Sequence, residues 1–132
     1  MACFLVGAAE AAVVTVAAHA LELRERKGEA KLTGAPKAAH SETIPWSRKL
    51  KWLSWLLWGG ALLLAFEHVW HGEVVPWFPF LTAAENPADM AEMLHEMATV
   101  GVTMAVIVTV VWAVMVAVAT HLLRRPEEAA AE

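Results

Sequence analysis

The segment 98–123, ATVGVTMAVIVTVVWAVMVAVATHLL, contains no lysine, arginine, aspartate or glutamate. An α-helix crosses the hydrocarbon core of a bilayer with roughly 20 apolar residues, and this segment is longer than that. Two further apolar runs occupy residues 2–21 and 52–71, each with few polar residues. The sequence therefore predicts three transmembrane helices, over about residues 2–21, 52–71 and 97–123.

The composition of the whole chain agrees with a membrane protein. Of its 132 residues, 58% are hydrophobic and 18% are charged, which is unusually apolar for a soluble domain. A soluble helical bundle would need a polar face on each helix, and the second and third runs have almost none. We expect one all-α domain over residues 1–132, a multi-pass protein of the cell inner (cytoplasmic) membrane.

The first run has some features of a secretory signal peptide, because Ala18-His19-Ala20 has the small-x-small pattern of a cleavage site. It lacks a basic start, however, and carries Glu10 in its middle. We therefore expect it to be retained as a membrane span.

Positive charge is confined to two parts of the chain. All ten Lys and Arg residues lie within 24–51 or at Arg124 and Arg125. Cytoplasmic loops retain Lys and Arg, so the N-terminus is expected outside and the C-terminus inside. The linker 28–45 is then cytoplasmic and the loop 72–86 lies outside. Asn86-Pro87 is typical of a helix start, so the third helix should extend from there on the outer side.

Carboxylates and imidazoles gather at the predicted outer ends of the second and third spans. The Glu67-x-x-x-His71 spacing places both side chains on one helix face. Glu92-x-x-His95 has the i, i+3 spacing used for carboxylate-bridged metals in helical bundles. We predict a site for a divalent or transition-metal ion at which the three histidines converge. Its predicted ligands are Glu67, His68, His71, Glu92, His95 and Glu96.

Glu10 is the acidic residue inside the first span, roughly 10 Å below its outer end at 1.5 Å per residue. Acids at such depth usually face a partner, a cavity or a transport path, because an unpaired charge there is costly. We predict that Glu10 faces the helix bundle or a subunit interface, with Thr103, Thr99 and His68 as favoured partners. Either an inward path for protons or ions, or a fixed packing contact, would explain it.

Two stripes run along the third span if it is a regular α-helix. The polar stripe consists of Glu92, Glu96, Thr99, Thr103 and His121. The methionine stripe consists of Met90, Met93, Met97, Met104 and Met115. Methionine and histidine together would suit a soft ion such as Cu(I), although here they point in opposite directions. Adaptable packing is the simpler interpretation of the methionines.

Small residues at Gly7, Gly59, Gly60 and Gly101 predict close approach between helices. Three helices alone cannot enclose a polar pathway, so a homo-oligomer or a larger membrane complex is expected.

Three functions follow from these patterns. The first is cation binding at the outer face, with ions or protons passing inward. The second is an accessory or structural subunit of a larger membrane complex. The third is an electron-transfer subunit with haem b between two of the histidines. The sequence contains no nucleophile–base constellation and no nucleotide-binding loop, so catalysis is not expected, and neither is nucleic-acid binding.

The segregation of Lys and Arg predicts a labelling pattern. Cysteines introduced within residues 73–86 should react with an impermeant thiol reagent on intact cells, above the labelling of the parent chain, and cysteines within 29–43 should not. The reverse pattern would place the acidic, histidine-rich face in the cytoplasm and contradict the predicted orientation.

Overall fold

The computed structural model describes residues 2–32 and 44–130, and every regular element in that part of the chain is helical. Three helical stretches are long and apolar enough to cross a membrane: Phe4–Gly28, Trp46–Trp70 and Pro87–Leu123. The prediction of three membrane helices is confirmed to this extent. In chain order the elements are α1 (Phe4–Leu32), α2 (Trp46–Trp70), the 3-10 turn η1 (Thr82–Glu85), α3 (Pro87–Glu96), the π-helical turn η2 (Met97–Gly101) and α4 (Val102–Ala130).

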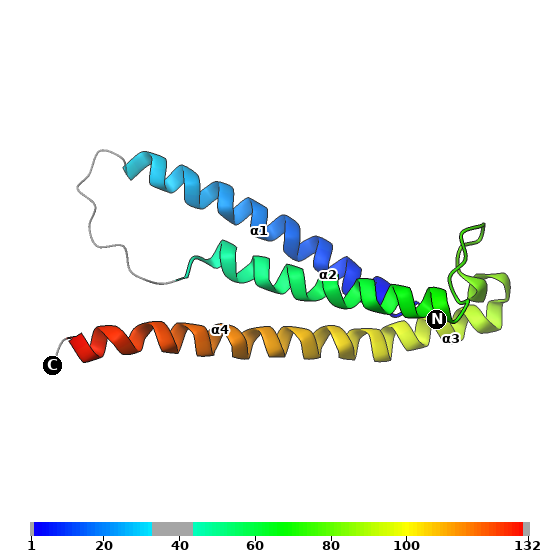
Figure 1. Ribbon diagram of the computed structural model, residues 1–132. Helices are drawn as coiled ribbons and strands as arrows, with labels where there is room; N and C mark the ends of the chain where they lie inside the picture. The colour runs from blue at the N-terminus through cyan, green and yellow to red at the C-terminus, as the bar shows by residue number, and fades with distance from the viewer. Residues whose placement is uncertain (1, 33–43, 131–132) are drawn as a thin grey trace.

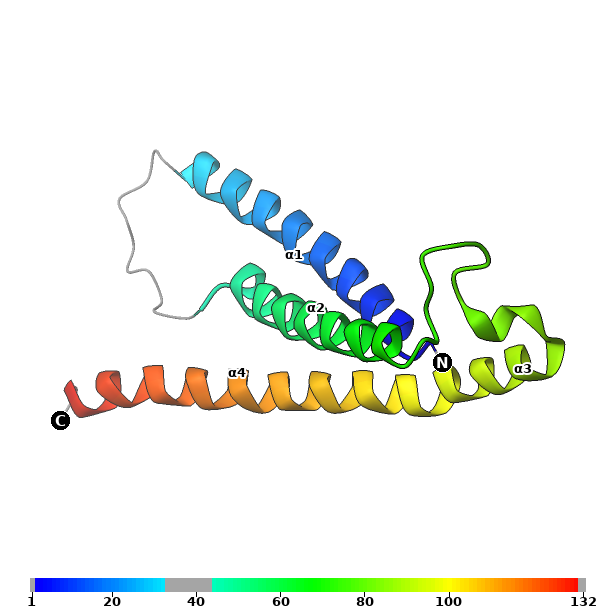
Figure 2. The same ribbon diagram turned by 45° about the vertical axis from the view of Figure 1, so that its right-hand side comes forward.

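The three long helices form an elongated bundle. α1 and α2 stay in contact from one end of the bundle to the other, whereas α4 runs alongside α2 and meets α1 near one end only (Figures 1 and 2). We call the end where α2 stops and α3 begins the acidic end, because all six predicted metal ligands lie there. The opposite end, where α1 carries Arg24 to Lys27 and α2 carries Arg48 to Lys51, is the basic end.

α1 extends four residues beyond Gly28, into the stretch 28–45 that was predicted to be a linker. A glycine inside a helix costs about 1 kcal/mol relative to alanine, and the residues after it, Glu-Ala-Lys-Leu, are good helix formers. The helix therefore continues to Leu32.

α2 ends at Trp70, and Gly72 follows two residues later with a φ of 74°. The Gly72 N–H donates to the carbonyl of Val69 at 3.1 Å, and the Glu73 N–H donates to the carbonyl of His68 at 2.9 Å. These two bonds define a Schellman motif, which needs a left-handed residue at this position. The turn brings Glu73 back over the last turn of α2.

The start of α3 is also as predicted. The Asn86 side chain accepts a hydrogen bond from the Ala88 N–H at 3.1 Å, and Pro87 occupies the first turn. An N-cap side chain of this kind satisfies one of the unpaired N–H groups at a helix start.

A π-helical turn, η2, interrupts the third helical segment between α3 and α4. The Thr99 hydroxyl donates to the His95 carbonyl at 2.8 Å, and the Thr103 hydroxyl donates to the Thr99 carbonyl at 2.7 Å. The two threonine hydroxyls therefore bond to backbone carbonyls just before η2 and within it. Such a turn holds one extra residue, so the parts before and after it are rotated by about 100° relative to a continuous α-helix.

The rotation turns the residues before η2 away from the faces that a regular helix would give them. Met93, before the turn, is 7% exposed, whereas Met104 and Met115, after it, are 41% and 38% exposed. The methionines therefore do not share one face, and adaptable packing applies to Met93 alone among these three.

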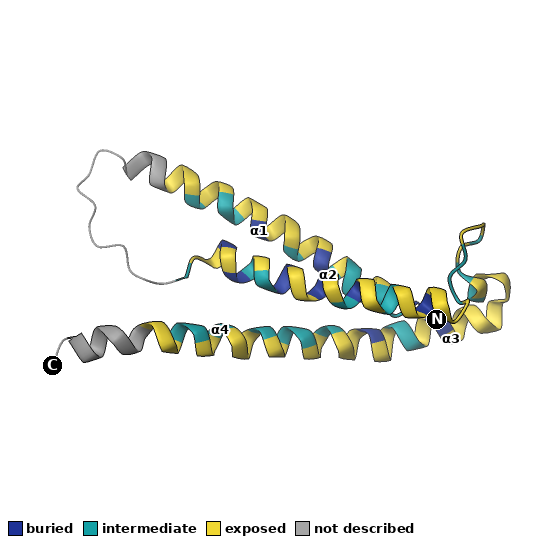
Figure 3. Cartoon of the chain, in the orientation of Figure 1, coloured by how far each residue is buried: buried dark blue, intermediate teal, exposed yellow. Residues whose placement is uncertain are grey.

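The buried core lies mainly between α1 and α2, whose facing residues are the buried ones in Figure 3. Ala11, Leu53 and Leu57 form its centre. Val14 of α1 and Val108 and Trp112 of α4 pack against this centre. Apolar contact drives helix association weakly in lipid, because lipid tails are equally apolar. Polar contacts between helices therefore matter more here than in a soluble bundle.

Side-chain hydrogen bonds join the helices within the apolar region. Thr15 of α1 and Ser54 of α2 have their hydroxyl oxygens 2.6 Å apart, and Trp58 Nε1 donates to the Thr15 hydroxyl at 3.1 Å. Trp112 Nε1 of α4 donates to the carbonyl of Lys49 at 2.7 Å. These bonds fix the relative depth of the helices as well as their contact.

At the basic end, carboxylates of α1 bind the first turn of α2. Glu25 accepts hydrogen bonds from the Ser47 N–H at 3.3 Å and from the Ser47 hydroxyl at 2.5 Å. Glu22 forms an ion pair with Lys51 at 2.9 Å. A negative charge is favourable at a helix N-terminus, where N–H groups lack partners inside the helix. Glu25 thus caps α2 from a neighbouring helix.

The glycines differ in what surrounds them. A Cβ added at Gly101 would lie 2.9 Å from Val6 Cγ2 and 3.3 Å from the Cys3 carbonyl oxygen, so α1 and η2 approach closely there. An added Cβ at Gly7 would meet Ala61 Cβ at 4.0 Å. Gly59 and Gly60 have nothing within 4 Å. The expectation of close packing at these two residues is therefore wrong within a single chain, because a Cβ added at either would enter open space.

The contrast between two of these glycines gives a stability test. Gly101→Ala should lower the free energy of unfolding by about 1–3 kcal/mol, because the new methyl group overpacks the contact with Val6 and Cys3. Gly59→Ala, in open space within α2, should raise it by about 0.5–1 kcal/mol through the lower backbone entropy of alanine. Thermal unfolding of purified protein in detergent, followed by circular dichroism, measures both. Equal effects of the two substitutions would contradict the close approach at Gly101.

Candidate functional site

Glu10 lies at a hollow between α1 and α4. The hollow has a volume of about 340 Å³, and its walls are Glu10, Val102, Ala105, Val106, Thr109 and Val110. The three valines are 45–56% exposed, so the hollow opens on the outside of the bundle. The Glu10 side chain is half-buried. A carboxyl group therefore borders a groove whose remaining walls are mostly apolar.

Glu10 has a hydrogen-bond partner on the third helical segment, as predicted, but the partner is Thr109. The Thr109 hydroxyl donates to Glu10 Oε1 at 2.8 Å. The favoured candidates Thr99 and Thr103 instead donate to carbonyls of their own helix, and His68 contacts the carbonyl of Leu64. Glu10 thus joins α1 to α4, deeper along the third segment than expected.

The Thr109 hydroxyl also lies 3.0 Å from the carbonyl oxygen of Ala105. A hydroxyl group has one hydrogen to donate and two lone pairs to accept with. It can therefore donate to Glu10 when the carboxyl is ionised. When the carboxyl is protonated, the hydroxyl can accept from Glu10 and donate to Ala105. The same three oxygen atoms accommodate both protonation states without a change of position.

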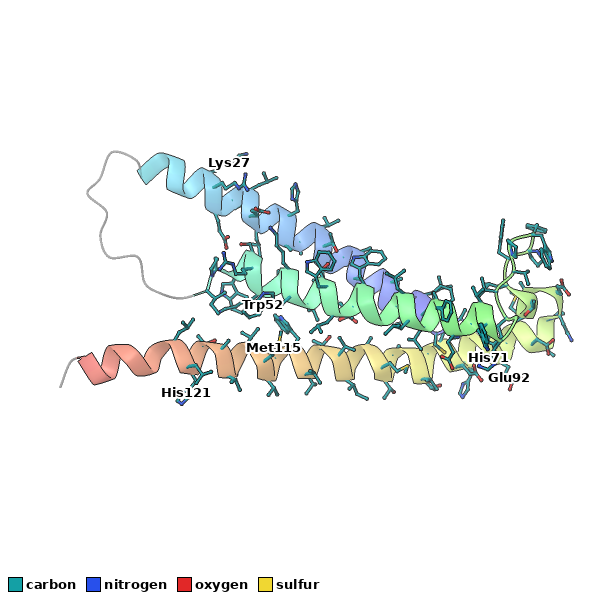
Figure 4. The ribbon with its side chains drawn as sticks, in the orientation of Figure 1. Lys27, Trp52, His71, Glu92, Met115 and His121 are labelled. Carbon is teal, nitrogen blue, oxygen red and sulfur yellow. The ribbon has the colours of Figure 1, made fainter. Side chains whose placement is uncertain are left out.

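The predicted metal ligands share the acidic end but differ in their surroundings. His68 is buried, Glu96 is half-buried, and the remaining four are exposed. His71, after the last turn of α2, and Glu92, on α3, lie at the same end of the bundle (Figure 4). His121 projects from α4 near the other end, on the side away from α1 and α2 (Figure 4). Among the described residues, no group of three or more His, Cys, Asp or Glu side chains is placed to hold a metal ion. The expected convergence of His68, His71 and His95 is not preformed.

His68 is the best-positioned residue of the acidic end. Its Nδ1 lies 2.6 Å from the carbonyl oxygen of Leu64. Because a carbonyl can only accept, Nδ1 carries the hydrogen, and in the neutral ring Nε2 keeps its lone pair. The ring packs edge-on against Phe4, with the centroids 5.4 Å apart. Metal-binding histidines are usually oriented in this way by a carbonyl on the far nitrogen.

Glu73 is the partner that the sequence did not suggest. Its Oε2 lies 3.8 Å from His68 Nε2. The Schellman turn at Gly72 places it there, by folding the chain back over the last turn of α2. A glycine just after a helix is the sequence signal that could have revealed this position of Glu73, because a left-handed residue there folds the next side chain back over the helix end.

No protein family, curated protein or solved structure matches this chain. A function can therefore be argued only from the residues and their geometry.

Proposed function

We propose that this protein is a small membrane protein that binds protons or other cations and passes them along a path that includes Glu10. The observation that carries this proposal is the Glu10–Thr109–Ala105 arrangement, which accommodates both the ionised and the protonated carboxyl. An ionisable residue within a membrane span is by default a candidate for such a role.

The charge distribution of the chain supports a path for cations. No Lys or Arg occurs from Trp52 to Leu123, whereas six carboxylates do. An acidic surface free of fixed positive charge raises the local concentration of cations. With the acidic end outside, as the positions of Lys and Arg suggest, cations would reach Glu10 from outside the cell.

Replacement of the carboxyl group tests the path. Glu10→Gln keeps the size of the side chain and its ability to bond to Thr109, but it cannot release a proton. In liposomes with a trapped pH indicator and an imposed membrane potential, proton uptake by Glu10→Gln should fall to that of empty liposomes. Glu85→Gln, in η1 away from the path, should retain the parent rate. Parent-like uptake by Glu10→Gln would refute a role of this carboxyl in transport.

Substitutions at two threonines test the contribution of the Thr109 hydroxyl to proton uptake separately from that of the Glu10 carboxyl. Thr109→Val removes the hydroxyl that contacts Glu10, and uptake should fall while the carboxyl remains. Thr120→Val is the matched control, because the Thr120 hydroxyl donates only to the Val116 carbonyl of its own helix. Absence of proton uptake by the parent protein itself would favour an accessory subunit.

The accessory-subunit alternative is favoured by the exposure of the third helical segment. Its most apolar window has a mean hydropathy of 2.6, with none of that window buried. Such a surface faces either lipid or another transmembrane protein. In that case the parent protein would show no transport activity, and Glu10→Gln would change its assembly with the larger complex.

A divalent metal ion at the acidic end is the second cation-binding candidate, and the His68–Glu73 pair favours it. Ligand bonds of about 2.1 Å place two ligands of one zinc ion no more than about 4 Å apart, and these two atoms are 3.8 Å apart. His71 is the nearest further imidazole in sequence. A visible spectrum of the purified protein distinguishes this site from haem, because only haem gives a Soret band.

Calorimetric titration with Zn²⁺ checks the metal site. Binding should be lost in His68→Gln, which removes the oriented imidazole, and kept in His121→Gln, whose imidazole lies near the opposite end of the bundle. Equal binding by both variants would mean that zinc binds elsewhere.

A further inference from the structure

The segment after α2 forms a closed hairpin, residues 74–81. Val74 and Leu81 make an isolated antiparallel bridge. Within it the Val75 N–H donates to the Phe80 carbonyl at 2.8 Å, and the Phe80 N–H donates to the Trp77 carbonyl at 2.7 Å. At its base the N–H and the hydroxyl of Thr82 both donate to the carbonyl of Glu73, at 3.1 and 3.2 Å. The backbone bonds therefore hold the tip in one conformation.

The tip of this hairpin is aromatic and exposed. Phe78 is 86% exposed, Trp77 64% and Phe80 56%. The rings of Phe78 and Phe80 contact each other edge-on, with their centroids 6.4 Å apart. No charged residue lies between Glu73 and Glu85. Three neighbouring exposed aromatic rings without charges mark a surface that is covered by something apolar.

Phe80 also occupies a backbone conformation that does not suit it. Its φ is 68°, in the left-handed region where bulky residues are rare and glycine is favoured. The hydrogen bonds of its own N–H and carbonyl hold it there. Strain of this kind is retained where the side chain serves a purpose, and here the strained residue contributes a ring to the exposed tip.

The direction of the hairpin indicates which apolar medium it meets. In both views it leaves the acidic end of the bundle across the helix axes, on the side of α1, and does not continue along them (Figures 1 and 2). For helices that cross a bilayer, this direction runs along the membrane surface. Trp70, the last residue of α2, is 79% exposed and stands where aromatic residues gather, at the membrane–water boundary.

From these observations we propose that the tip of the 74–81 hairpin inserts into the lipid bilayer, at the boundary between headgroups and acyl chains. Tryptophan and phenylalanine without neighbouring charge fit this layer, into which apolar faces sink by roughly 5–10 Å. Because the base of the hairpin is bonded to Glu73, insertion also fixes the end of α2 beside His68. This inference does not depend on transport by Glu10.

Spin labels at defined positions test the insertion. The label is attached to Phe78→Cys, or separately to Trp77→Cys, in the full chain with Cys3→Ser, since Cys3 is the only cysteine. Glu85→Cys in η1 is the matched control on the same loop. In liposomes of phosphatidylcholine and phosphatidylglycerol, labels at 77 and 78 should collide more with oxygen, which dissolves in lipid, than with a water-soluble nickel chelate. The label at 85 should show the reverse.

Two results would overturn the proposal. Nickel collisions at 77 and 78 as frequent as at 85 would show that the tip lies in water, where a soluble partner could bind it. Spectral broadening between labels that disappears on dilution with unlabelled protein would show that the tip meets a second copy of the chain.

Discussion

Each pair of long helices in this protein is joined by a side-chain hydrogen bond in the apolar region. Thr15 and Ser54 join α1 to α2, Glu10 and Thr109 join α1 to α4, and the Trp112 side chain joins α4 to the backbone of α2. Within a bilayer, a polar group left without a partner costs several kcal/mol. Sliding one helix by a single turn would break two of these three bonds together, because each helix takes part in two of them. The polar contacts therefore set the relative depth of the three helices, and the apolar contacts add to their packing.

Glu10 takes part in this arrangement and is also the carboxyl on which the proposed path depends. Its carboxyl is part of what holds α4 against α1, yet it also lies at a groove that opens between exposed valines. A purely structural contact would gain from full burial, since a low dielectric strengthens the bond. Glu10 is instead half-buried at a groove whose exposed valines would face lipid or a neighbouring helix. The proposal of proton movement therefore rests on the Glu10–Thr109–Ala105 arrangement and not on this exposure.

Local signals in the sequence predicted the parts of the fold that are determined locally. The apolar runs predicted three helices, and Asn86-Pro87 predicted the start of α3. What could not be predicted was the relative depth of the helices. Thr109 lies six residues, or about 9 Å at 1.5 Å per residue, beyond Thr103, because the close contact at Gly101 sets α4 against α1. The pattern of residues along a single helix gives no information about this offset between two helices.

The candidate site at the acidic end could likewise be predicted only in part. Its residues were identified by type and spacing, and they do share one end of the bundle. The pairing of His68 with Glu73 depends on a turn that reverses the chain, and the exposure of His71, Glu92 and His95 depends on how α3 leaves the bundle. Of the six predicted ligands, His68 is the one with an oriented imidazole, and the carboxylate beside it, Glu73, was not among the six.

The π-helical turn at Met97–Gly101 acts as a one-residue insertion that the helix has absorbed. Deleting any residue of this turn would restore a regular α-helix and swing α3 by about 100° around its axis. The membrane part, from Gly101 onward, would stay in place. Chain length in this short stretch is therefore under a stricter constraint than its composition. Side chains other than that of Gly101 can be exchanged there, but gaining or losing one residue would redirect α3.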